Sequence, residues 1–573
     1  MKKINILSLI FISLLALQIN GQNSKNQFSL WPKYQYLELK DLDTITAQKW
    51  INKQHVIRGW DWSLPNYVEP SKKSLVGLQR NIGLNKKFEP LNLKFKSNAI
   101  GILWVKWRDI EPTEGNYNFQ PIIDRIQQAN AVGSDIILRI LGHSKSRGTG
   151  PKALKRGEAP LWLEDLGVNF LPKKKSGHNL NFDPSHPEFH KRYLKLIEEL
   201  SKTDIPKMVK AAYVGYASHS FGDEGIGPYR EKESVANDTV KHVRERLDIW
   251  HKAFKGMEHK IFMGGPIDYG FKKGFGVRRG FVEMYMYVIP NEDLGQYIDD
   301  NGYLSIDEDA PILKNNGFNG EVNEEYEEAW ATAGRNFRFG KTTEAYPYRY
   351  FTSTLRALQM RCTYIHTTGH LMPKMLPFLS QELGRTIEDT PDVWTFLRTS
   401  YIKSKYYQDN DHKNRRISIK EENEGIETKN FERWLHQRDA PGYETEPVIK
   451  VEHPIKMWMI QDDKGFDYIA RKGKKIGFNI DDRWAAHKKE KKLAIKISYF
   501  DNDEGALLLR FKKGNQIISK EQLLTNDGDL KTVTFFIENL KNNAAGEGFD
   551  FILENTDSTK TITVSMVRIV KAE

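Results

Sequence analysis

The sequence predicts an α/β protein: a (β/α)8 TIM barrel followed by a C-terminal β-sandwich. Two observations lead to this prediction. Between about residues 50 and 400, short β-branched or aromatic runs alternate with stretches whose apolar residues recur at helical spacing. From about residue 448 onward, short strands follow one another with only turns between them, which is typical of a sandwich.

The expected barrel occupies residues 50–400 and needs eight strands, each followed by a helix. The expected strands are Val56–Trp60, Ala99–Trp104, Asp135–Ile140, Ala211–Tyr216, Lys260–Gly264, Leu294–Tyr297, Pro311–Asn315 and Cys362–His366. Helical spacing is clearest in Pro121–Ala131, Pro187–Ser201, Val240–Phe254 and Tyr348–Gln359. Residues 401–447 are polar and charged and are expected to link or wrap the domains, and the sandwich is expected over 448–573.

Composition and charge restrict the class of protein. A chain of 573 residues with 39% hydrophobic content is long enough for two or three domains with full cores. Lys plus Arg number 86 and Asp plus Glu 75, and the net charge of +11 favours polyanionic partners such as nucleic acid, anionic lipid or acidic polysaccharide. Cys362 is the only cysteine, which excludes disulfides and cysteine-based zinc sites.

The N-terminus has the pattern of a secretory signal peptide over residues 1–22. Lys2 and Lys3 precede the apolar run Ile4–Leu17, which is short for a bilayer span and is followed by polar residues. We therefore expect a secreted or periplasmic bacterial protein with no membrane span after signal cleavage. Export makes extracellular polymers the expected partners and argues against nucleic acid.

Two glutamates stand where a barrel builds its active site, at the ends of strands. Glu224 follows the fourth expected strand among the glycines Gly222 and Gly225, a setting in which the pKa of a carboxyl can rise enough for a general acid. Glu321 follows the seventh expected strand. The glutamates after it, Glu324 to Glu328, are explained as acids in the first turn of a helix.

The segment after the second expected strand carries a family resemblance. Trp107 to Phe119 resembles the W-x-x-x-E-P-x-E-G-x-Y-x-F motif of clan A glycoside hydrolases, notably their β-galactosidase-like branch. The resemblance covers about residues 55–400 and implies that Glu224 is the acid/base and Glu321 the nucleophile of a retaining mechanism. Glu111, inside the motif, is expected to hold the turn between strand and helix.

One position departs from the family pattern. The clan usually has Asn before the acid/base glutamate, where it donates to the sugar 2-hydroxyl, whereas this chain has Asp223, which when ionised only accepts. Asn315, Asn316, Asn319, Ser218 and His219 are the candidates to replace that donor.

Other residues are expected to bind substrate. Trp60, Trp107 and Tyr297 lie near strand ends and could stack on sugar rings, and His143, His219, Asn319 and His366 could contact the substrate by hydrogen bonds. The long loop from Gly142 to about Asn181 is rich in cations, including Lys173, Lys174 and Lys175, and favours sulfate or carboxylate groups on a polymer.

No motif predicts a cofactor or a metal. The chain has no phosphate loop, no H-E-x-x-H pair, no dinucleotide fingerprint and no G-x-S-x-G elbow. Asp501–Gly505 has some features of a calcium loop but lacks the remaining ligand spacing, so a hairpin turn is expected.

The sequence therefore favours a secreted glycosidase that cleaves a plant or algal polysaccharide, with anionic or sulfated polymers among the expected substrates. A polysaccharide lyase acting on uronic-acid polymers would also suit the basic charge, although lyases typically use Tyr, His or Lys as base. A carbohydrate-binding barrel without catalysis is the third reading, which Asp223 keeps open. The sugar, the linkage, endo or exo action and the oligomeric state are not encoded in any motif.

Overall fold

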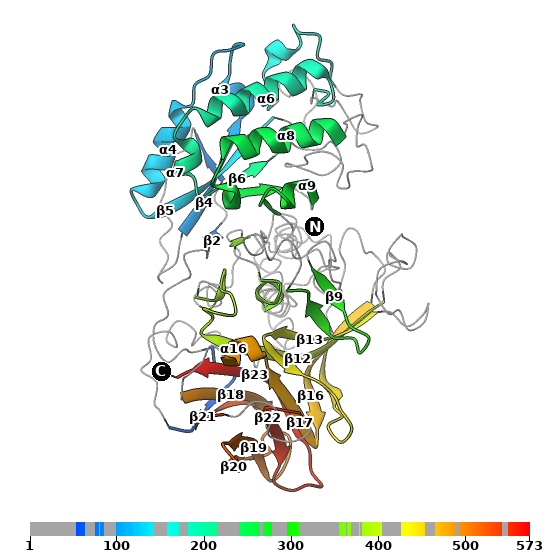
Figure 1. Cartoon of the computed structure of the whole chain (residues 1–573). Helices are drawn as coiled ribbons and strands as arrows, with labels where there is room; N and C mark the ends of the chain where they lie inside the picture. The colour runs from blue at the N-terminus through cyan, green and yellow to red at the C-terminus, as the bar shows by residue number, and fades with distance from the viewer. Residues whose placement is uncertain are drawn as a thin grey trace, which may run out of the picture.

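The computed structural model describes seventeen parts of the chain. These are residues 53–62, 75–78, 81–84, 99–142, 158–170, 182–214, 240–263, 268–277, 295–308, 355–361, 364–367, 378, 381–403, 426–452, 464–486, 492–540 and 548–572. In Figure 1 the helices and the parallel strands gather at the top, and the antiparallel sheets of the C-terminal half lie at the bottom.

A six-stranded parallel sheet forms the centre of the α/β part. Its order is β3-β4-β5-β6-β7-β8, which follows the order of the chain. The bounds are β3 Asn81–Gly83, β4 Ala99–Lys106, β5 Ser134–Leu141, β6 Ala211–Val214, β7 Ile261–Met263 and β8 Gly276–Val277. The expected strands at 99–104, 135–140, 211–216 and 260–264 are confirmed as neighbours in one parallel sheet.

Helices follow the strands, as the alternating pattern predicts. They are α3 Trp107–Ile110, α4 Gln120–Asn130, η1 Leu161–Leu163, α6 Pro187–Ser201, α7 Ile205–Met208, α8 Val240–Ala253, η2 Glu258–Lys260 and α9 Asp268–Phe271. Pro121 and Pro187 stand in the first turns of α4 and α6, where a missing N–H costs nothing. Figure 1 shows α6 and α8 side by side over the sheet.

The two faces of the parallel sheet bury different residues. Leu103, Ile136, Leu138 and Ala212 point to the helices and join one large core cluster. The alternate positions, including Ile137, Ala211 and Phe262, form a separate small cluster on the opposite face. A sheet that is covered on one side by helices and apolar on the other is the local structure of a barrel wall.

A second parallel pair involves strands far apart in the sequence. β11 (Tyr364–Thr367), at the predicted position of the eighth strand, pairs in parallel with β2 (Leu75–Leu78) in a two-stranded sheet, and β3, which begins three residues after β2, pairs with β4. The predicted seventh strand, Pro311–Asn315, lies outside the described residues.

Two predicted barrel strands belong elsewhere. β1 (His55–Arg58) pairs antiparallel with β21 of the C-terminal half, so Val56–Trp60 is not the first barrel strand. Its alternating burial suits the edge of an antiparallel sheet, whereas barrel strands are buried on both faces. β9 (Gln296–Ile298), at the predicted sixth strand, forms an antiparallel hairpin with β10 (Leu304–Ile306) instead of joining the parallel sheet.

The C-terminal half consists of two antiparallel sheets. One has the order β1-β21-β18-β23-β12-β16-β15 with β13 beside β12, and the other has the order β14-β17-β22-β19-β20. Their bounds are β12 Asp392–Lys403, β13 Ile426–Arg433, β14 Leu435–Gln437, β15 Glu446–Glu452, β16 Lys464–Gly473, β17 Lys475–Ile480, α16 Asp482–Ala486, β18 Lys492–Phe500, β19 Ala506–Lys513, β20 Gln516–Leu523, β21 Leu530–Glu538, β22 Phe551–Asn555 and β23 Ile562–Lys571.

Apolar side chains from both sheets share one core. Ile495 of β18 and Val567 of β23 join Phe478 of β17 and Leu509 of β19 in a single cluster. The other face of the larger sheet, through Trp394 and Phe396 of β12, belongs to the cluster that also contains the barrel helices. The larger sheet is therefore apolar on both faces.

The predicted linker region contains regular structure where it is described. Within 401–447 the described residues include the end of β12, which starts the larger sheet at Asp392, then β13, β14 and the start of β15. Two buried charged residues of this region have charged partners: Arg433 donates to Glu382, and Glu432 pairs with Arg438 at 2.8 Å. These two residues therefore belong to the folded C-terminal half and not to an exposed connector. Among the described residues no helix is long and apolar enough to cross a membrane.

Candidate active site

Four side chains from adjacent parallel strands form a layer inside the sheet. The strand register aligns Trp104 of β4 with Arg139 of β5, Arg139 with Tyr213 of β6, and Tyr213 with Phe262 of β7. Arg139, Tyr213 and Phe262 are buried, and Trp104 is half-buried. The layer lies toward the carboxyl ends of the strands, the end at which barrel enzymes build their active sites.

Arg139 supplies a positive charge to this layer. Its guanidinium carbon lies 3.7 Å from the centre of the Trp104 ring and 5.7 Å from that of Tyr213. A guanidinium packed on aromatic faces keeps its charge in a site of low dielectric. Such a charge favours the ionised form of a nearby carboxyl group.

The Glu-Pro-x-Glu-Gly motif forms the turn that leaves β4. Glu111 is fully buried, and its carboxylate accepts hydrogen bonds from Trp107 Nε1 at 2.7 Å and Gly115 N at 2.9 Å. Burial raises the pKa of Glu111, which those hydrogen bonds partly offset. Gly115 adopts a φ of 74°, in the left-handed region that glycine tolerates. The expected structural role of Glu111 is confirmed.

The predicted catalytic residues lie outside the described residues. These are Glu224 and Glu321, together with the candidate contacts His143, His219 and Asn319. The structure therefore describes the strand that leads toward Glu224 but not the glutamate itself. β6 ends at Val214 and is a central strand of the parallel sheet, as the sequence predicts for the strand before Glu224.

Trp60 is not a sugar platform, which corrects the prediction. It is 2% exposed, and its indole nitrogen donates to Ser565 Oγ at 3.3 Å. Its ring meets Phe396 edge-on at 6.1 Å, beneath the larger antiparallel sheet. The tryptophan therefore fixes the N-terminal segment to the C-terminal half, where β1 pairs with β21.

Trp107 is also a core residue, contrary to the prediction. It has no exposed surface, and its ring is surrounded edge-on by Trp162, Phe189 and Tyr193. Trp107 begins α3, so its side chain points into the layer of helices that covers the sheet. A ring packed on all sides has no face left for a sugar.

Two other predicted contacts are on described strands. Tyr297 is half-buried in the middle of β9, opposite Ser305 of β10. His366 lies on β11 opposite Gly77 of β2. β11 and β2 form a two-stranded sheet of their own, and β9 and β10 form another, so neither His366 nor Tyr297 lies on the six-stranded sheet that carries Arg139.

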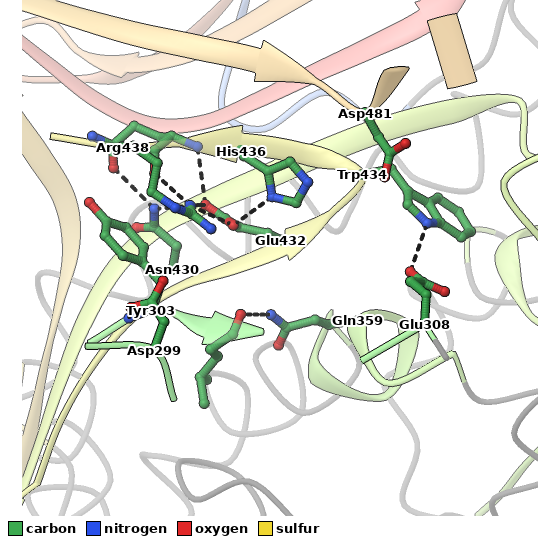
Figure 2. A network of polar contacts seen from close by, with 12 residues as sticks. Asp299, Tyr303, Glu308, Gln359, Asn430, Glu432, Trp434, His436, Arg438 and Asp481 are labelled. Atoms are coloured by element: carbon green, nitrogen blue, oxygen red, sulfur yellow. Dashed lines mark hydrogen bonds and ion pairs between the residues drawn. The ribbon is translucent and has the colours of Figure 1, made fainter. Parts of the chain in front are cut away.

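The hairpin β9–β10 is held against β13 and β14 by a polar network (Figure 2). Glu432 accepts from Arg438 at 2.8 Å and lies 3.0 Å from His436 Nδ1, and these cations hold the pKa of Glu432 down at about 2 despite its burial. Arg438 also lies 4.1 Å from the ring centre of Tyr303, in the hairpin turn. The network makes the hairpin a fixed part of the C-terminal half.

The residues on either side of the lysine-rich loop contact each other. Phe170 and Phe182 form an antiparallel bridge with their rings stacked at 4.4 Å, and Asp183 N donates to Asn169 O at 2.8 Å. Lys173, Lys174 and Lys175 lie in the eleven residues between, 171–181, outside the described residues. The loop carrying these cations therefore starts and ends at one point.

The calcium-like loop is not a hairpin turn, which corrects the expectation: it connects β18 of the larger antiparallel sheet to β19 of the smaller one. Asp501 accepts from Thr525 N at 3.0 Å and from Lys531 Nζ at 2.6 Å, and Lys531 also reaches Asp527 at 2.6 Å. The ammonium group of Lys531 thus takes the position between carboxylates that a cation would need. Asp503 instead accepts from the hydroxyls of Thr561 and Thr563.

Arg139 is the residue of this site that the sequence analysis missed. A charged residue inside the apolar run Ile136–Leu141 is the signal that could have revealed it, because Arg is rarely fully buried in a strand.

Comparisons with known proteins give distant likenesses. No family model matches the chain, and no curated protein matches it. Among solved structures, endo-glycoceramidase II from Rhodococcus sp., described as a lactosyl-enzyme intermediate, aligns at 10% identity and a TM-score of 0.30 over 82% of this chain and 99% of its own. Xylanase 10B from Thermotoga maritima aligns at 13% identity and a TM-score of 0.24 over 47% of this chain and 74% of its own. An endo-1,4-beta-xylanase from Caldicellulosiruptor owensensis aligns at 12% identity and a TM-score of 0.28, covering 53% of this chain and 88% of that enzyme. At these scores the functional assignment has to rest on the chain's own residues.

Proposed function

We propose that the chain is a glycoside hydrolase of the clan A type that acts on a polysaccharide with Glu224 and Glu321. The observation that supports this most directly is the strand order. Glu224 follows the last residue of β6 by ten positions, and β6 lies at the centre of a parallel sheet whose carboxyl-terminal half is lined by Trp104, Arg139 and Tyr213. The motif after β4 also folds as the turn that the resemblance implies.

In the proposed mechanism the two glutamates flank the scissile bond. Glu224 protonates the leaving oxygen and later deprotonates water, and Glu321 attacks the anomeric carbon. Retention requires carboxyl groups about 5 to 5.5 Å apart, whereas inversion needs roughly 6.5 to 9.5 Å. The positive charge of Arg139 in the layer of strand-end residues supports a nucleophile that is ionised at neutral pH.

The architecture we propose is a (β/α)8 barrel followed by a β-sandwich. The parallel neighbours β11 and β2 support closure of the barrel, and the shared core of the two antiparallel sheets supports the sandwich. The proposed sandwich starts at Asp392 with β12 and recruits β1 from the N-terminal side, which differs from the predicted start at 448.

We further propose an anionic polysaccharide as substrate and a secreted or periplasmic location. The net charge of +11 and the pinned loop with three consecutive lysines support the anionic substrate. The basic and apolar N-terminal pattern of residues 1–22 supports export.

Product analysis of the wild-type protein tests the class of reaction. The chain is incubated with a panel of neutral, sulfated and uronic-acid polysaccharides, and reducing ends and ultraviolet absorbance are followed together. A hydrolase releases reducing ends without new absorbance. Ultraviolet absorbance from an unsaturated sugar would identify a lyase. Binding of the polysaccharide without new reducing ends or new absorbance would identify a binding protein.

A further inference from the structure

Two histidines and a glutamate come together on the outer helices, away from the proposed active site. His190 lies on α6, and His242 and Glu245 lie on α8; their ligand atoms are all within 4.8 Å of one another. His190 Nε2 is 2.7 Å from Glu245 Oε2, and the rings of the two histidines stack with centres 4.2 Å apart. We propose that these three side chains form a zinc-binding site that ties α6 to α8.

The two helices hold the site in a fixed register. Trp250 of α8 donates to the hydroxyl of Tyr193 on α6 at 3.0 Å, and both residues are fully buried. Tyr193 follows His190 by three residues and Trp250 follows His242 by eight, spacings that keep each pair on one face of its helix. His242 and Glu245 are likewise three residues apart. The three ligands are therefore presented by packed helices rather than by a loop.

The histidines bind a metal through a nitrogen of the neutral imidazole ring. In His190 the nitrogen nearest to Glu245 is Nε2. When Nε2 binds the metal, the ring proton moves to Nδ1.

The ligand set selects the kind of ion. Ca²⁺ and Mg²⁺ need several oxygen ligands, and this site offers a single carboxylate with the buried Arg246 beside it. Two imidazoles and one carboxylate are instead a ligand set typical of Zn²⁺.

Metal binding requires the three side chains to adjust, because the two stacked rings must tilt before a nitrogen of each faces the same ion. Zinc bonds of about 2.0–2.2 Å require the paired nitrogen and oxygen to separate to somewhat more than their present 2.7 Å. Glu245 is able to move because its side chain is 37% exposed and is otherwise paired only loosely with Lys241, at 3.7 Å. His242 is half-buried, so water can complete a tetrahedron from the open side.

The test measures Zn²⁺ binding to the full chain after chelator treatment, by titration against a chromophoric chelator, with Co²⁺ absorption as a second readout. His242→Gln and Glu245→Gln are the main variants because both side chains are partly exposed and their loss leaves the helix packing in place. The matched control is His251→Gln with Glu258→Gln. His251 Nε2 lies 3.5 Å from Glu258 Oε1 near the end of α8, and among the described residues this pair belongs to no group of three metal-binding side chains.

We expect one Zn²⁺ per chain and a tetrahedral Co²⁺ spectrum in the wild type and in the control. Each main variant is expected to bind Zn²⁺ at least about tenfold more weakly, since loss of even an outer partner costs that much, and to lose the Co²⁺ spectrum. Zn²⁺ should also raise the melting temperature of the wild type but not of the main variants. Absence of binding by the wild type, or equal binding by the main variants and the control, would overturn the proposal.

Discussion

The guanidinium of Arg139 lies 3.7 Å from the ring centre of Trp104, on the strand next to it. The two residues are 35 positions apart in the sequence, and only the parallel pairing of β4 and β5 makes them neighbours. Arg139 is buried near the carboxyl end of β5, and a positive charge there favours the ionised form of a nearby carboxyl group. In the proposed mechanism that carboxyl group is the nucleophile, Glu321.

Replacement of Arg139 by Met should change the pH dependence of catalysis. Met keeps an apolar chain against Trp104 but removes the charge, so the pKa of the proposed nucleophile should rise. We expect kcat/KM to fall by roughly 10²–10³-fold, and the acidic limb of its pH profile to move to higher pH. Arg125→Met is the control, because Arg125 lies on α4 and donates to Leu84 O. An unchanged acidic limb in Arg139→Met would show that Arg139 does not lower the pKa of the nucleophile.

Loss of Asp61 should destabilise the protein through Lys496. The two side chains are buried and form an ion pair between the N-terminal segment and β18, and burial lowers the pKa of Lys496 to about 8. Asp61→Asn leaves a buried ammonium without its carboxylate, and we expect a loss of about 3–5 kcal/mol in the free energy of unfolding. Urea unfolding measures it. The double variant Asp61→Asn with Lys496→Met should recover most of the loss, and equal stability of the single and double variants would contradict this account.

Stability should decline as the pH rises above 4.5 because of Glu382. This buried carboxyl is hydrogen-bonded to Asp392, and burial together with the charge of Asp392 raises its pKa above 4.5. The folded chain then holds a proton that the unfolded chain releases, so the free energy of unfolding declines by up to about 1.4 kcal/mol per pH unit as the pH rises from 4.5 to the raised pKa. Urea unfolding at several pH values measures the slope. Glu382→Gln mimics the protonated form and should flatten it, while an unchanged slope in Glu382→Gln would refute the assignment.

The lysine-rich loop should matter for anionic substrates only. Replacement of Lys173, Lys174 and Lys175 by Gln removes three positive charges from the loop pinned by Phe170 and Phe182. We expect KM to rise on sulfated or uronic-acid polysaccharides and to stay the same on neutral ones. Steady-state kinetics on both classes of polysaccharide measures this difference in KM. An equal rise in KM on both classes would show that the three lysines do not recognise anionic groups. The charge-matched control for surface effects replaces three exposed lysines by Gln: Lys191 on α6, Lys202 directly after it and Lys207 on α7.

The barrel strands that the sequence predicts best are those buried on both faces. β4, β5 and β6 are nearly continuous apolar runs, and such runs occur in parallel sheets covered by helices. Val56–Trp60 looked similar because it contains Val, Ile and Trp, but its polar ends, His55 and Arg58, belong to an edge strand. No local pattern reveals that this strand pairs with β21, almost 480 residues away.

The candidate site was harder to predict because aromatic residues serve both the core and the binding of sugars. Trp60 and Trp107 stand close to strand ends, yet one packs on the C-terminal sheet and the other among the helices. Trp104, three residues before Trp107, points instead to the interior with Arg139. Which face a side chain takes depends on its register in the sheet, and that register is fixed by pairing with distant strands.

The most direct test of the central claim compares Glu224→Gln and Glu321→Gln with the wild type on a polysaccharide that the wild type degrades. Glu114→Gln is the control, a partly exposed glutamate of the same chain that pairs with Arg192 at 2.5 Å. We predict that both main variants still bind the polysaccharide while kcat for reducing-end release falls by at least about 10³-fold, and that the control retains activity. Reducing-end release at the wild-type rate by either main variant would contradict the assignment of Glu224 and Glu321 as the catalytic pair.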